Sequence, residues 1–227
     1  MRNRIAQVGK AVVTTKKTTN GVTTPAYWAD ACAHLCKRDR VMKRLIPRFG
    51  EACLESRGDA FVTLARSIVG QQISVKAAQS VWNRFEALPR RMAPGQVLKL
   101  KVDDMRAAGL SARKVEYLVD LALHFDNGVI HVEQWQQMDD EAIIAELVAI
   151  RGIGRWTAEM FLIFHLMRPD VLPLDDLGLI KGISVNYFSG EPVSRIEARE
   201  VAEAWAPWRS VATWYMWRAL DPTPVSY

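Results

Sequence analysis

Apolar residues recur every three or four positions along most of the chain, which is the spacing of helices with one buried face. Two such segments lie between Pro25 and about Glu55, and two more lie between Phe61 and Leu88. A further helix is predicted from Ser111 through Phe125, because serine is a common N-cap and Asn127-Gly128 is a common helix end. No segment shows the strict alternation of a strand, so the pattern predicts an all-α fold.

The most informative pattern starts at Asp139 or Asp140, either of which can cap a helix. Gly152 and Gly154 interrupt this helix, and helical spacing resumes at Arg155. A glycine turn that leads into a helix leaves amide groups without intrahelical partners and without side chains in front of them. Such a turn favours phosphate binding. The same glycines also suit a hairpin of two helices in which they only permit tight packing.

Three more helices are predicted towards the end of the chain. The first follows Asp176 and continues to Phe188. Ser194 and Glu197 have the spacing of a capping box, which starts the second. Proline suits the first turn of a helix, so we expect the last helix to span Pro207–Ala219.

Composition and charge narrow the class of protein. The 227 residues carry a net charge of +5, which favours a polyanionic partner without proving one. No apolar stretch is long enough to span a membrane. The three cysteines suit a reducing compartment, so we expect a cytoplasmic protein, associated with the nucleoid in a bacterium or nuclear in a eukaryote. We also expect a monomer. Arg113 and Lys114 are expected on a solvated face rather than at a phosphate.

The string IRGIGRWTA, from Ile150 to Ala158, resembles the helix-hairpin-helix of DNA repair enzymes. With the aspartate that follows it, the chain resembles the helix-hairpin-helix Gly/Pro-Asp superfamily of DNA glycosylases, most closely its 3-methyladenine DNA glycosylase II branch. The resemblance begins near residue 26 and covers nearly all of the remaining chain, without the N-terminal β domain of larger members.

This resemblance implies two helical subdomains that flank a base-binding cleft. One combines residues 25–59 with 186–227. The other spans residues 60–185 and contains the helix-hairpin-helix at about 140–167. Residues 1–24 are expected to form a flexible basic arm.

The resemblance also implies the chemistry. Asp175 and Asp176 compete for the role of catalytic carboxylate, and the Asp-Leu-Gly pattern of the branch favours Asp176. Trp156 stands where lyase-type members carry a lysine that forms a Schiff base, and an indole cannot attack a sugar carbon. The implied activity is therefore monofunctional: hydrolysis of the N-glycosidic bond of alkylated purines flipped out of duplex DNA, in base excision repair, with no lyase activity.

The implied roles agree with elementary chemistry. Glycosidic cleavage builds positive charge on the sugar, and a fixed carboxylate stabilises that charge and guides water. A methylated purine is electron-poor and would stack on indole through cation-π attraction, worth roughly 0.5–2 kcal/mol. The expected base pocket comprises Trp156, Met160 and Trp217, although Trp217 is as consistent with a core position.

Other positions are assigned by the same resemblance. Gln72 falls where relatives insert a side chain into the duplex, although the two glutamines could instead only hold the loop backbone together. Phosphate contacts are expected from Gly152, Gly154, Arg155 and Thr157, and a monovalent cation, Na+ or K+, at the carbonyls of Ile150 and Ile153. No cofactor and no catalytic metal are expected.

Two other functions are compatible with these residues. The protein could bind DNA structures through the hairpin without catalysis, in which case Asp176 would be a helix cap. It could also be a glycosylase for oxidised or mismatched bases.

Overall fold

The computed structural model describes residues 15–17, 23–50, 52–56 and 59–221. The α-helices are α1 (Trp28–Arg38), α2 (Arg40–Leu45), α3 (Ala60–Gly70), α4 (Val75–Glu86), α5 (Pro94–Val97), α6 (Val102–Ala107), α7 (Ala112–Asp126), α8 (Asp140–Val148), α9 (Arg155–Phe164), α10 (Leu177–Tyr187), α11 (Arg195–Glu203) and α12 (Arg209–Leu220). Short 3-10 helices are η1 (Ile46–Phe49) and η2 (Val132–Gln134), and the strands are β1 (Thr15–Lys17) and β2 (Thr23–Pro25). The predicted all-α fold is confirmed.

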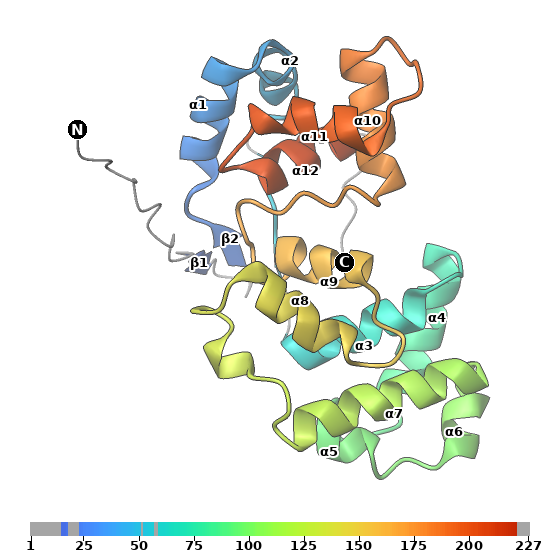
Figure 1. The fold of residues 1–227 in the computed structure, drawn as a ribbon. Helices are drawn as coiled ribbons and strands as arrows, with labels where there is room; N and C mark the ends of the chain where they lie inside the picture. Colours follow the sequence, from blue (N-terminus) through green and yellow to red (C-terminus); the bar gives the residue numbers. More distant parts are fainter. Residues whose placement is uncertain (1–14, 18–22, 51, 57–58, 222–227) are drawn as a thin grey trace.

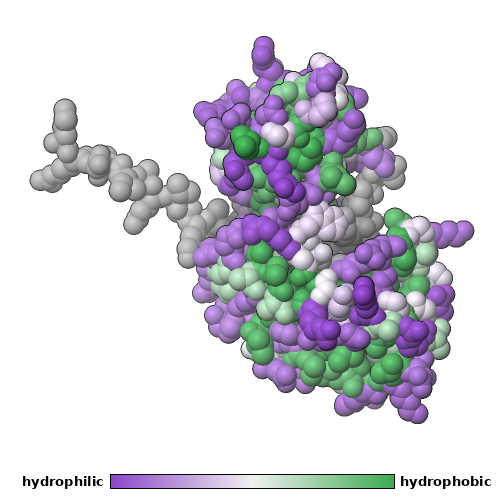
Figure 2. Space-filling model, turned by 45° about the vertical axis from the view of Figure 1, so that its right-hand side comes forward, coloured by the Kyte–Doolittle hydropathy of each residue, from purple (hydrophilic) through white to green (hydrophobic). Residues whose placement is uncertain are grey.

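The helices form two halves (Figure 1). Helices α3 to α9 make one half, and α1, α2, α10, α11 and α12 make the other, so that both ends of the chain contribute to the same half. Helix α10 packs on α12. The packing therefore divides the chain near Asp176, about one helix earlier than the boundary expected after residue 185. On the face shown in Figure 2, hydrophilic and hydrophobic side chains are interspersed over both halves, and the surface narrows between them.

The expectation that the chain has no strand is wrong at one place. Strands β1 and β2 pair antiparallel, with Thr15 opposite Pro25 and Lys17 opposite Thr23. Threonine favours a strand because its branched side chain suits a pleated surface, but three residues a side are too few to show periodicity in the sequence. The rest of the predicted basic arm, residues 1–14 and 18–22, lies outside the described residues.

Serine and aspartate caps set most helix starts, as the sequence predicts. Ser74, Ser111 and Ser194 each accept a hydrogen bond from a backbone N–H in the first turn of the following helix. Asp139, rather than Asp140, is the N-cap of α8. Ser194 and Glu197 form the predicted capping box.

The last helix starts two residues later than predicted. Its first residue is Arg209 rather than Pro207, because a loop from elsewhere in the chain fixes this end. Asp170 accepts hydrogen bonds from the backbone N–H of Arg209 at 3.2 Å and from its guanidinium at 2.7 Å. The backbone N–H of Ser210 donates to the carbonyl of Pro169 at 3.0 Å. Among the described residues, none of the helices has the length and apolar character that a bilayer crossing requires.

Candidate functional site

The hairpin turn between α8 and α9 depends on Gly152. Its backbone has φ +85°, and a Cβ at this position would overlap the ring of Tyr117 on α7. Glycine is therefore required both for the backbone conformation and for the close approach. The carbonyl of Gly152 accepts a hydrogen bond from Nε2 of Gln71 at 2.9 Å, which ties the hairpin to the loop after α3.

Gly154 leaves the start of α9 open. It is the N-cap residue and has no side chain to cap the first amide groups. A Cβ at Gly154 would meet no atom within 4 Å, so the space in front of this helix end is free among the described residues. Unsatisfied amides at an open helix start attract anions. The geometry suits the predicted phosphate contact, which stays a prediction.

The carboxylate of Asp176 is held by three hydrogen bonds. Oδ1 accepts from the backbone N–H of Leu179 at 2.6 Å, so Asp176 is the N-cap of α10. Oδ1 also accepts from Nε1 of Trp217 at 2.7 Å, and Oδ2 accepts from Nε1 of Trp156 at 2.9 Å. A carboxylate offers about four acceptor positions. One position on Oδ2 is therefore left for a ligand or water, in a side chain that is only 9% exposed.

The position two residues after Asp176, occupied by Gly178, has no room for a larger side chain. A Cβ at this position would lie 3.0 Å from Cδ1 of Trp217 and 3.1 Å from Oδ1 of Asp176. Both distances are shorter than ordinary van der Waals contact. The glycine lets the indole of Trp217 reach the carboxylate.

Trp217 therefore contacts the carboxylate from α12. Its ring stacks on Phe164 of α9, with centroids 5.5 Å apart and an interplanar angle of 11°. Phe164 in turn forms part of the wall of a cavity between α3, α4 and α9. The expected direct contact between Trp217 and a base stays a prediction, and the observed contacts are to Asp176 and Phe164.

A cavity of about 440 Å³ lies between α3, α4 and α9. Trp156 and Met160, two of the expected pocket residues, line it together with Thr157. Trp156 is 39% exposed and lines the cavity, while its Nε1 donates a hydrogen bond to Asp176. The wall includes Arg66 but no aspartate, glutamate or histidine among the described residues.

The two glutamines after α3 have different environments. Gln71 binds the hairpin, as described above. Gln72 is exposed at the tip of the loop with φ +58°, a conformation that residues other than glycine rarely adopt. Gln71 therefore ties the loop to the hairpin, as one of the two alternatives expected, and entry of Gln72 into a duplex stays a prediction.

We expected Lys114 on a solvated face, but its amine is bound to backbone carbonyls. Its Nζ donates to the carbonyls of Val69 at 2.7 Å and Gln71 at 2.8 Å, at the end of α3. Burial lowers the pKa of the Lys114 amine. A cation at a helix C-terminus is stabilised by the helix dipole. This contact joins segments about 40 residues apart, so local sequence patterns do not predict it.

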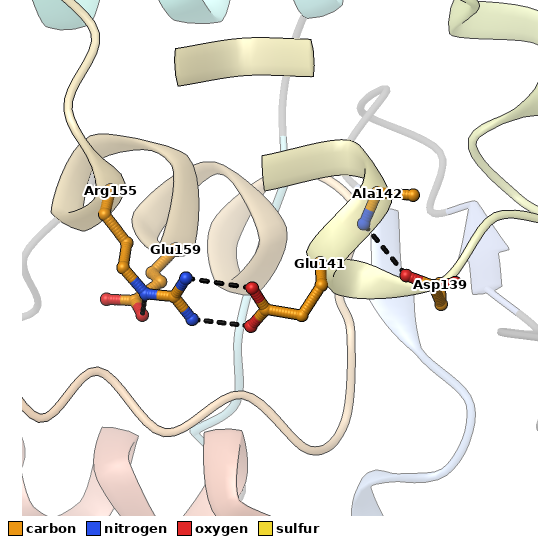
Figure 3. Close-up of polar contacts among 5 residues, drawn as sticks. All are labelled: Asp139, Glu141, Ala142, Arg155 and Glu159. Atoms are coloured by element: carbon orange, nitrogen blue, oxygen red, sulfur yellow. Dashed lines mark hydrogen bonds and ion pairs between the residues drawn. The ribbon is translucent and has the colours of Figure 1, made fainter. Parts of the chain in front are cut away.

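The charged residues around the hairpin are paired. Arg155, an expected phosphate ligand, contacts Glu141 and Glu159 (Figure 3). Asp175 is exposed and its Oδ1 lies 2.7 Å from Nη2 of Arg195. The exposure of Asp175 agrees with the expectation that it faces solvent, and the catalytic role of Asp176 stays a prediction.

The described residues contain no group of three or more His, Cys, Asp or Glu that could hold a metal ion. A monovalent cation would instead need carbonyl oxygens. The carbonyl of Ile150 already accepts the N–H of Ile153 at 3.1 Å, but a carbonyl oxygen has a second lone pair. The cation at Ile150 and Ile153 stays a prediction.

Comparison with known proteins assigns the chain to a family. Residues 65–207 match the model of the HhH-GPD superfamily base excision DNA repair proteins. The chain is 33% identical over 193 residues to DNA-3-methyladenine glycosylase 1 of Schizosaccharomyces pombe, covering 82% of this chain and 84% of that protein.

Solved structures agree. A DNA-3-methyladenine glycosidase from Bacillus halodurans has a TM-score of 0.79 at 34% identity, covering 84% of this chain and 89% of that one. A 3-methyladenine DNA glycosylase from Schizosaccharomyces pombe, in complex with abasic DNA, has a TM-score of 0.71 at 32% identity, covering 86% of this chain and 100% of that one.

Proposed function

Because the chain belongs to the HhH-GPD superfamily of base excision DNA repair proteins, we propose that it is a monofunctional DNA glycosylase for alkylated purines. Its substrate is a base of the 3-methyladenine type, flipped out of duplex DNA, and its reaction is hydrolysis of the N-glycosidic bond. The names of the related proteins support this substrate class.

The observation that carries the proposal is the environment of Asp176. Its three donors are two indole N–H groups and one backbone N–H, all of them neutral. They orient the carboxylate without cancelling its charge. A negative charge fixed in a site with little water is what stabilises a sugar cation. The free acceptor position on Oδ2 is where an attacking water or the sugar would approach.

The cavity wall supports a cationic base as the leaving group. A neutral base needs a proton from a general acid before it leaves, and the described wall contains no carboxyl or imidazole group. A base that alkylation has made cationic leaves without that proton. The exposed face of Trp156 offers cation-π stacking to such a base.

DNA contact is proposed at the hairpin and at the loop after α3. The open start of α9 seats a phosphate, and Gln72 fills the gap left by the flipped nucleotide. Extruding a nucleotide costs a few kcal/mol, less for a weakly paired damaged base.

Base release from methylated duplex DNA tests the proposal, with Asp176→Asn as the main variant and Asp175→Asn as the matched control. Asparagine keeps the N-cap, but its amide group would point a donor at Trp156 Nε1. We expect Asp176→Asn to lose about 10²–10⁴-fold in rate, while Asp175→Asn stays close to wild type. Equal rates for Asp176→Asn and wild type would remove Asp176 from this role.

A borohydride trap on abasic DNA tests the absence of lyase activity. We expect no covalent adduct, since Trp156 has no amine. A trapped adduct would contradict the monofunctional mechanism. A mass-spectrometric scan over alkylated, oxidised and mismatched bases identifies the released base.

The cap at α10 also fits the non-catalytic alternative, in which Asp176 serves the helix alone. In that case the wild-type protein would bind DNA tightly and release no base from any lesion in the scan.

A further inference from the structure

Each nitrogen of the Arg155 guanidinium donates a hydrogen bond to a carboxylate, and half of the side chain surface stays exposed (Figure 3). Nη1 and Nη2 donate to the two oxygens of Glu141 on α8, at 2.9 and 2.5 Å. Nε donates to Oε1 of Glu159, one turn further along α9, at 3.0 Å. The guanidinium is therefore shared by two acids at the base of the hairpin.

Glu159 is the unusual member of this cluster, because it is only 5% exposed. Burial raises the pKa of its carboxyl group, and Arg155 opposes that rise. Asp175 and Glu141 are near enough to raise the pKa further. A buried carboxylate needs a partner, and Arg155 provides a charged one.

The stability of α9 does not explain an arginine at this position. Arg155 stands in the first turn, where the helix dipole disfavours a positive charge. An arginine four residues before a glutamate is also the weaker of the two orientations for such a pair. The acids explain it better: without Arg155, the repulsion of Glu141 and Glu159 would act on any phosphate at the start of the same helix.

We propose that Arg155 is an internal counter-ion that cancels the charge of Glu159 and Glu141 beside the hairpin, and not a ligand of DNA phosphate. The backbone amides at the start of α9 hold the phosphate, and Arg155 is a positioning residue that makes this possible. The inference rests on the proposed binding of DNA by the hairpin, and it replaces the expectation that the guanidinium itself contacts the strand.

The test is DNA affinity over a series of salt concentrations, for duplexes with and without an abasic-site analogue. The proteins are wild type, Arg155→Gln, and the double variant Arg155→Gln/Glu159→Gln. The single variant leaves two acids without their cation. The double variant removes one positive and one negative charge, so the net charge of the cluster stays that of wild type and no buried charge loses its partner.

We expect Arg155→Gln to bind about tenfold more weakly at low salt, the size of effect that one charge near the site exerts. The double variant should bind within about twofold of wild type, with the same slope of log affinity against log salt. If Arg155 were a phosphate ligand, the double variant would stay as weak as the single one, and its slope would fall by about one unit.

The double variant decides the question by itself if Arg155→Gln fails to fold. Base release is measured separately, so a wild-type protein that binds DNA without releasing bases would contradict the proposed function and leave this comparison valid. A wild-type protein that binds no DNA would overturn both.

Discussion

Nε1 of Trp217 lies 2.7 Å from Oδ1 of Asp176 and donates a hydrogen bond to it. Trp217 belongs to α12, while the second indole donor, Trp156, belongs to α9 in the other half of the molecule. The carboxylate is thus held from both halves at once. Its orientation depends on how the halves pack, and not only on the loop that carries it.

Replacing Trp217 by phenylalanine removes this donor and keeps an aromatic ring against Phe164. Because a hydrogen bond to a charged group contributes roughly 1.5–3 kcal/mol, we expect single-turnover base release to slow by about 10- to 100-fold. The midpoint of thermal unfolding should also fall, because the same hydrogen bond stabilises the folded protein, so base release is measured well below that midpoint. An unchanged rate would mean that Leu179 and Trp156 suffice to orient the carboxylate.

Gly178→Ala should separate activity from stability. Alanine favours a helix over glycine by about 1 kcal/mol, so the helix itself gains. The added Cβ, 3.0 Å from the indole of Trp217, displaces the indole or the carboxylate. We expect base release to fall by about tenfold or more. The neighbouring Leu177→Ala is the control, since Leu177 is 84% exposed.

Variants of Gln71 and Gln72 should differ in how their rate of base release depends on base pairing at the lesion. Gln72→Ala is expected to slow release of a paired lesion by roughly tenfold, because the flipped state loses its filler. The same variant should act normally on a lesion opposite an abasic site, which is already unpaired. Gln71→Ala removes the hydrogen bond to Gly152 and should slow base release from both substrates alike. Equal behaviour of the two variants would contradict this division of roles.

His165 should make stability depend on pH. Burial lowers the pKa of its imidazole to about 4, well below the usual value near 6.5. Between these values the unfolded chain binds a proton that the folded protein does not, so stability falls as the pH drops from about 6.5 towards 4.

The expected loss is roughly 3 kcal/mol over the whole window, from about 1.4 kcal/mol per pKa unit. Urea unfolding at pH 7 and pH 5 measures part of it. His165→Asn removes the titrating group and should flatten the dependence. If the variant keeps the slope of wild type, other groups are responsible.

Local signals in the sequence predicted much of this fold. Ser74, Ser111 and Ser194 accept hydrogen bonds from residues within one turn of their own position, so these caps can be predicted without any tertiary contact. The hairpin glycines and the Asp-Leu-Gly corner are also local. The sequence therefore placed Asp176 at the start of a helix beside the hairpin turn.

Contacts between distant segments could not be predicted in the same way. Lys114 reaches the end of α3, and Trp217 turns to Asp176 rather than to the cavity, because of how separate helices pack. Arg155 looks like a phosphate ligand in sequence, where only its position beside the glycines is visible. Its partner Glu141 is identified only when α8 and α9 are placed together.

The two roles of Asp176, the observed cap of α10 and the proposed catalytic carboxylate, have a consequence for a cell that carries a mutated copy of this gene. An asparagine there would still close the end of α10 and leave the hairpin intact, so the altered protein should fold and occupy lesions it is unable to clear. Such an occupant would shield the injured nucleotide from every other repair route, and we expect it to be more harmful under alkylation stress than loss of the protein altogether.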